Sequence, residues 1–182
     1  MSKILYLQKK DDEILFEVNH ETQKRINCIT LKRKDSFFII KCMKRIEFLL
    51  NSNINKISLI NLKYLQTEYK PSMSLYKFFR RLIKFTGAEE NTILYSIYLI
   101  ERLNDKYHLL NENNIFLLVY ISLIISLKYN EDEKLSCKYL AECIGLNLKE
   151  LRNMEYEFCC INKFNFYIKG KVLRDYKTKF FI

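Results

Sequence analysis

Residues 115–133 read IFLLVYISLIISLKYNEDE, and this stretch decides the fold class. Ile115 to Leu127 is an almost unbroken apolar run that ends in Lys128 and an acidic cluster. The run is shorter than the roughly 20 apolar residues needed to span a bilayer, so we expect no membrane partner. A helix that is apolar on every side must be surrounded by other elements. We therefore predict that it forms the centre of an all-α bundle.

The composition supports helices and argues against a metal site. The 182 residues include only one proline and three glycines, too few for a many-turned β-sandwich. The six cysteines show no C-x-x-C spacing, and with two histidines they cannot assemble a zinc site. The N-terminus becomes charged before a signal-peptide core is complete. We expect an intracellular protein with reduced thiols, no metal and no cofactor.

The net charge of +10 is concentrated in the two ends of the chain. Residues 1–70 hold 14 Lys and Arg against 8 Asp and Glu, and residues 163–182 hold 6 against 1. Residues 71–162 hold 11 against 12 and are nearly neutral. This pattern argues against nucleic-acid binding by the central part, although the basic ends leave that activity open.

Apolar residues at helical spacing predict one helix before residue 70 and five between residues 74 and 162. The first, residues 36–50, is capped by Asp35 or Ser36. Asn147 and Glu150 form a predicted capping box that opens the last. Residues 1–35 contain EILFEV and CITLKR, which fit either a small hairpin or an irregular arm. We divide the remainder into a helix and linker at 36–70, a main domain at 71–168 and a basic C-terminal tail at 169–182.

Glu101 falls on an otherwise apolar helix face. Glu101 shares a face with Leu94, Ile97 and Tyr98, and a buried carboxylate without a partner is costly. Arg81, at the rim of the preceding helix, is the nearest candidate cation. We predict a buried Arg81–Glu101 ion pair that fixes how the two helices cross.

Lys128 and Glu155 allow two interpretations. Separately, Lys128 is a solvated lysine at a helix C-terminus, and Glu155 is an exposed glutamate paired with Arg152. Together they place opposite charges at the same end of the bundle, beside an apolar surface, as a protein interface would. Periodicity alone does not choose between these interpretations.

The order of four motifs resembles the cyclin box, specifically that of the phosphate-pathway (P/U-type) cyclins. The motifs are PSMSLYKFFRRLIKF, YSIYLIERL, ISLKYNEDEKLSCKYLAECIGL and LKELRNMEYEFCCINKFNFYI, within residues 71–168. The resemblance covers somewhat over half of the chain. It implies a single cyclin box, a five-helix bundle around a central apolar helix, preceded by the N-terminal helix.

The resemblance also implies site residues. In cyclins, the positions matching Lys128 and Glu155 contact a cyclin-dependent kinase around its mobile regulatory helix. We expect apolar contact from Tyr129, Leu151, Met154 and Phe158. The family's buried arginine and acid match Arg81 and Glu101. Its substrate-docking row is replaced here by polar residues and glycine, at Arg80, Lys84 and Gly87.

The implied function is that of a regulatory subunit, not an enzyme, that binds and activates a cyclin-dependent Ser/Thr protein kinase. No catalytic constellation or small-molecule site is visible in the sequence. The alternatives are a cyclin-box adaptor without kinase binding and a nucleic-acid-binding protein resembling general transcription factor IIB. Cell division and phosphate signalling both fit the subfamily, and we expect the protein in the nucleus and cytoplasm.

Overall fold

The computed structural model describes residues 33–68, 71–132 and 135–181, and every regular element within them is an α-helix. The all-α prediction is confirmed. The uncertain segment at 1–35 lies outside the described residues, except for its last three residues. The helices are α2 (Arg33–Asn51), α3 (Leu75–Thr86), α4 (Glu90–Tyr107), α5 (Ile115–Asn130), α6 (Cys137–Glu142), α7 (Leu148–Ile161) and α8 (Gly170–Phe181).

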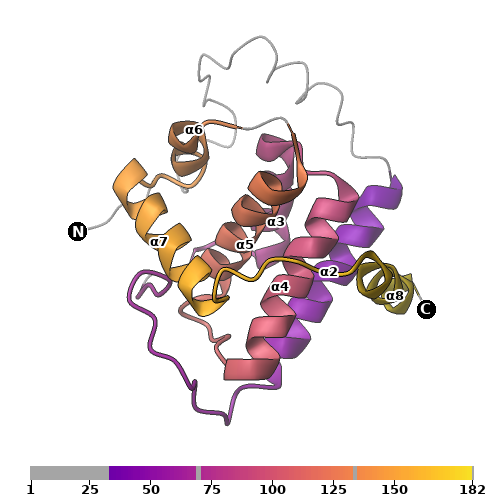
Figure 1. The fold of residues 1–182 in the computed structure, drawn as a ribbon, viewed down its shortest axis with the longest axis horizontal. Helices are drawn as coiled ribbons and strands as arrows, with labels where there is room; N and C mark the ends of the chain where they lie inside the picture. Colours follow the sequence, from indigo (N-terminus) through magenta and orange to yellow (C-terminus); the bar gives the residue numbers. More distant parts are fainter. Residues whose placement is uncertain (1–32, 69–70, 133–134, 182) are drawn as a thin grey trace.

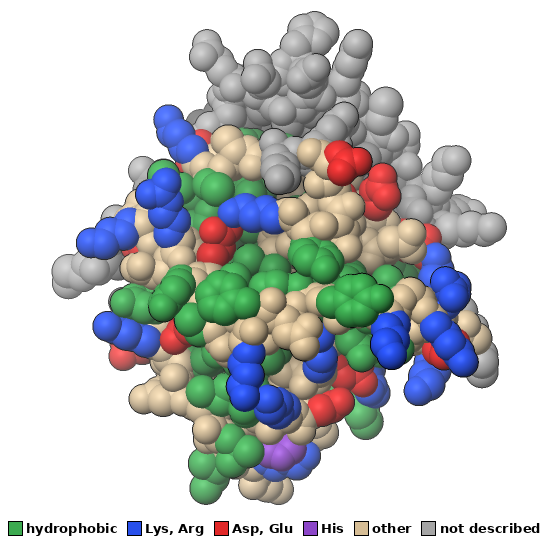
Figure 2. All heavy atoms as spheres, in the orientation of Figure 1, with side chains coloured by type: hydrophobic (Ala, Val, Ile, Leu, Met, Phe, Trp, Pro, Cys, Tyr) green, Lys and Arg blue, Asp and Glu red, His purple; other side chains and the backbone are tan. Residues whose placement is uncertain are grey.

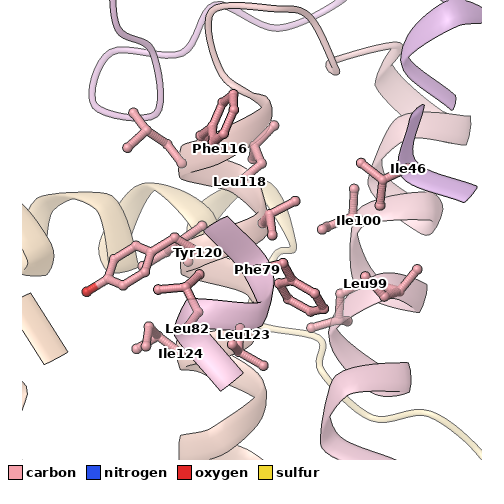
Figure 3. Close-up of a cluster of buried hydrophobic side chains, with 14 of the residues drawn as sticks. Ile46, Phe79, Leu82, Leu99, Ile100, Phe116, Leu118, Tyr120, Leu123 and Ile124 are labelled. Atoms are coloured by element: carbon pink, nitrogen blue, oxygen red, sulfur yellow. The ribbon is translucent and has the colours of Figure 1, made fainter. Parts of the chain in front are cut away.

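The central position predicted for α5 is confirmed. Every residue from Ile115 to Leu127 is buried, and α5 packs against α3, α4 and α7. Figure 1 shows α5 in the middle of the bundle, with α6 and α7 on one side and α2, α4 and α8 on the other. In Figure 3, Phe79 of α3 and Leu99 of α4 lie in one apolar cluster with Leu123 of α5. Removal of this continuous apolar surface from water is the main stabilising contribution to the fold.

Local signals set the helix ends. The Ser74 side chain accepts a hydrogen bond from the Lys77 amide at the start of α3, and Gly87 ends that helix with a left-handed φ of 67°. The predicted capping box of Asn147 and Glu150 is present at the start of α7. Helix α2 begins at Arg33, three residues before the start predicted from the sequence, so Asp35 and Ser36 lie inside it.

The predicted basic tail contains an ordered helix. In α8, the partly buried Leu173 and Tyr176 lie at helical spacing and pack against the core. The ring of Tyr176 meets that of Tyr98 on α4 edge-on, with centroids 5.1 Å apart. The sequence signal was weak because cations are interspersed among the apolar and aromatic residues of α8. Because of this helix, the basic C-terminal residues lie beside α4 rather than apart from the domain.

The linker between α2 and α3 is held against α7 by one carboxylate. Glu157 accepts hydrogen bonds from the backbone amides of Lys63, Tyr64 and Leu65, at 2.6, 2.7 and 2.8 Å. Three successive amides directed at one anion form a backbone nest. The buried side chain of Leu65 lies at the same point. The sequence predicted no role for Glu157, because the backbone amide donors of a linker carry no sequence pattern.

Candidate functional site

Lys128 and Glu155 are brought together at the junction of α5 and α7. The Lys128 ammonium donates a hydrogen bond to Oε1 of Glu155 and a second one, of 3.2 Å, to Sγ of Cys137. The two side chains remain 30% and 17% exposed, respectively. Glu155 is therefore not paired with Arg152, as the separate interpretation had it, but with the lysine that closes the central helix.

The electrostatics of this pair favour the charged form of Lys128. Burial by itself lowers the pKa of Lys128, but the hydrogen bond and negative charge of Glu155 outweigh it, so the pKa is raised. An ammonium has three donors, of which two are used, and the Glu155 carboxylate has further acceptor positions. The pair can therefore present both a donor and an acceptor to a docking protein.

An aromatic stack lies beside the pair. Tyr129 is 51% exposed. Its ring stacks on Tyr95 of α4, with centroids 5.7 Å apart, and its other neighbour is Phe166 at 6.2 Å. The Tyr95 hydroxyl donates to the backbone carbonyl of Phe166, and burial raises the pKa of this hydroxyl to about 12. The predicted surface position of Tyr129 agrees with its exposure, and its neighbours hold its ring in place.

Three of the predicted contact residues are core residues instead. Leu151, Met154 and Phe158 are buried beneath α7, where they complete the hydrophobic core. Because helical spacing of three and four defines the inner face of a helix, this stripe had to face the bundle. The expectation that these three side chains supply a surface for a partner is wrong for this structure.

The exposed aromatic residues of this region were missed by sequence analysis. Tyr156 follows Glu155 on the outer face of α7, and Phe164 and Tyr167 lie in the segment after α7; all three are well exposed. Figure 2 shows hydrophobic side chains gathered across the middle of this face, with charged side chains around them. The sequence did contain a signal for Tyr156. It lies two positions after the buried Met154, and in a helix this spacing places a side chain on the opposite, outer face. This aromatic set suits a protein interface better than the buried stripe does.

The predicted Arg81–Glu101 pair is not formed. Glu101 instead accepts hydrogen bonds from Nε (3.1 Å) and Nη2 of Arg45 on α2, and from the hydroxyl of Tyr176 on α8. The prediction that Glu101 has a cationic partner was right, but the partner was misassigned. Because α4 is buried on several sides, its Glu101 face is covered by α2 and α8 rather than by α3.

Arg81 lies in a different environment. Its guanidinium group sits 5.2 Å from the ring centroid of Phe85, and it is close enough to Cys143 for its charge to act on that thiol. Its Nε atom is buried and has no hydrogen-bond partner in the described part of the chain. Arg81 therefore belongs to the contact between α3 and the α6 region.

The described residues hold no group of three or more His, Cys, Asp or Glu side chains able to bind a metal ion. None of the helices in residues 33–68, 71–132 and 135–181 is long and apolar enough to cross a membrane.

Comparison with known proteins identifies the family. The cyclin family model matches residues 17–166, well over half of the chain. The chain belongs to the cyclin family. The match starts before residue 71 and therefore also covers α2. Cyclin-U2-1 of Arabidopsis thaliana is 25% identical over 108 residues, which are 58% of this chain and 49% of the relative. This chain thus spans about half the length of that relative, and the predicted resemblance to U-type cyclins is confirmed.

Proposed function

We propose that this cyclin is a non-catalytic regulatory subunit that binds and activates a cyclin-dependent Ser/Thr protein kinase. The observation that carries the proposal is the Lys128–Glu155 pair at the junction of α5 and α7. In cyclins, the positions matching these two residues contact the kinase. Both are partly exposed here, and each retains hydrogen-bonding capacity for a partner.

The contact surface consists of the charged pair and the aromatic residues around it. Tyr129 lies on the α5 side, and Tyr156 lies on the α7 side. The aromatic rings provide apolar area with little conformational entropy to lose, while the pair fixes the register of the docked helix. Leu151, Met154 and Phe158 support this surface from within, because they hold α7 against the core.

Activation follows from differential binding. A kinase exchanges between an inactive state and a state in which its own Lys–Glu pair and metal-binding aspartate are aligned for phosphoryl transfer. The cyclin surface binds the regulatory helix in its inward position better than in its outward position. Cyclin binding therefore shifts the kinase population toward the active state. The free energy of this shift equals at most the difference between the binding free energies of the two states.

The test is co-purification with a panel of cyclin-dependent kinases, followed by a protein-phosphorylation assay. The chain should bind and activate at least one kinase, and the Lys128→Ala/Glu155→Ala double variant should do so weakly. The matched control is Glu90→Ala/Lys177→Ala, which removes a 2.8 Å ion pair between α4 and α8. Equal activation by wild type and the Lys128/Glu155 variant would place the interface elsewhere. No binding to any kinase would favour the adaptor or nucleic-acid alternatives.

A further inference from the structure

Helix α2 has an apolar character on both sides. Its inner side is the expected buried stripe, which includes Phe38, Cys42 and Ile46. Its outer side also carries large apolar residues: Phe37 and Phe48 are 57% and 60% exposed, and Ile40 is 37% exposed. At 100° per residue, these three lie on the face opposite the buried stripe. An amphipathic helix that needs only to pack on its own core has no requirement for such residues outside.

Cations lie among these apolar side chains. Lys44 is exposed on the same outer face, between Ile40 and Phe48. The ammonium of Lys41 lies 5.0 Å from the ring centroid of Phe37. The guanidinium of Arg45 lies 5.3 Å from that of Phe48. We call Phe37, Ile40, Lys41, Lys44 and Phe48 the α2 outer face.

The basic C-terminal helix extends this surface. Arg45 of α2 and Tyr176 of α8 bind the same Glu101 carboxylate, so the two basic ends of the chain meet over α4. Figure 1 shows α8 beside α2 and α4, on the side of the bundle away from α7. Lys171, Arg174 and Lys179 of α8 are exposed. The basic C-terminal segment therefore meets α2 at Glu101, close to Arg45.

We propose that the α2 outer face, together with the exposed cations of α8, is a second protein-docking surface, and that its ligand is an acidic amphipathic helix of a partner protein. Phe37 and Phe48 are 11 positions apart, about 16 Å along the helix. A partner helix of three turns can place apolar side chains against both ends of this face and carboxylates against its middle. This site is separate from the Lys128–Glu155 surface, so one cyclin can hold the kinase and this partner together.

The spacing of the apolar residues favours a helical peptide as the ligand. Ile40, Lys44 and Phe48 recur at four-residue intervals on one face of α2, with Phe37 one turn earlier, and a second helix can match this spacing with its own anchors. Lys41 lies over the ring of Phe37, and Arg45 lies over the ring of Phe48, so cations lie beside both apolar anchors. Arg45 is further held by Glu101. The α2 outer face thus offers apolar anchors with positive charge between them, which fits an acidic peptide.

The probe for this site is a synthetic 18-residue fluorescein-labelled peptide with leucines at three anchor positions matching the apolar spacing of α2 and glutamates between them. Its control has lysines in place of the glutamates. Fluorescence anisotropy with the full chain should show binding of the acidic peptide and at least about tenfold weaker binding of the basic one. Added salt should weaken the acidic complex.

Variants locate the binding. Lys44→Glu and Phe48→Ser should each weaken binding of the acidic peptide about tenfold. Lys77 is an exposed lysine on α3, and Lys77→Glu should leave this affinity unchanged. Equal loss with Lys44→Glu and Lys77→Glu would mean attraction to net charge only and would overturn the proposal. So would equal binding of the two peptides. If a single-stranded oligonucleotide bound more tightly than the acidic peptide, and this binding depended on Lys44, the ligand of the α2 outer face would be a nucleic acid and the proposal would be overturned. None of these readouts requires a kinase, so they are independent of the proposed activation.

Discussion

Arg45 and Glu101, 56 positions apart in the sequence, form a two-point contact between α2 and α4. The Tyr176 hydroxyl from α8 donates to the same carboxylate. Burial, followed by the hydrogen bond to Glu101, raises the pKa of Tyr176, and its hydroxyl therefore stays protonated as a donor. One partly buried acid thus joins α2, α4 and α8.

We predict that Arg45→Ala destabilises the protein by about 1–3 kcal/mol, because it leaves the Glu101 carboxylate with fewer donors. Tyr176→Phe should cost about 1–2 kcal/mol, since it removes one hydrogen bond to a charged group. Urea unfolding measures both. The neighbouring exposed Lys44→Ala is the control and should change the unfolding free energy by less than about 0.5 kcal/mol. Equal stability of Arg45→Ala and Lys44→Ala would contradict the role of the pair.

The backbone nest around Glu157 gives a residue-specific prediction. Glu157→Gln should lower the unfolding free energy by about 1–3 kcal/mol, because a neutral side chain with one oxygen replaces a charged acceptor of three amides. Amide hydrogen exchange should accelerate at Lys63, Tyr64 and Leu65 and remain unchanged in α5. The exposed Glu47→Gln provides the control. Unchanged exchange at the three linker amides would show that Glu157 does not hold the linker.

The thiols should differ widely in reactivity. Burial raises the pKa of Cys143 to about 12 from a reference value of 9.0, so its thiolate fraction at pH 8 falls about a thousandfold. Cys160 is exposed on α7. Iodoacetamide labelling followed by peptide mass spectrometry should therefore modify Cys160 far sooner than Cys143. Comparable labelling of the two thiols in the folded protein would show that the partial burial of Cys143 does not suppress its thiolate.

The sequence was informative where a periodic pattern decides the structure. The apolar run at 115–127 predicted the central helix α5. The pair Asn147 and Glu150 predicted the capping box at the start of α7. The helix at the C-terminus was not predicted, because its contact with the core depends on Tyr176 and a few apolar neighbours within a basic segment.

The candidate site was only partly predictable for the same reason. Lys128 and Glu155 were recognised from their positions, but periodicity does not reveal that they bind each other. The stripe containing Leu151 was taken for a surface, although its spacing is that of a core face. The partner of Glu101 could not be found from neighbouring helices, because Arg45 precedes the expected box. Ion pairs between residues far apart in the sequence can be identified only once the packing of the helices is known.

Kinase docking through Lys128 and Glu155 can be tested with the charge-swapped variant Lys128→Glu/Glu155→Lys, by measuring its affinity for a partner kinase. The swap preserves an ion pair, so the melting temperature should stay close to that of wild type, while both charges presented to the kinase are reversed. We predict at least about tenfold weaker kinase binding by calorimetry. Each charge of the pair faces its own complementary group on the partner, so reversing both charges replaces attraction with repulsion. A folded swap variant that binds the kinase as tightly as wild type would contradict the account and leave the pair as scaffold only.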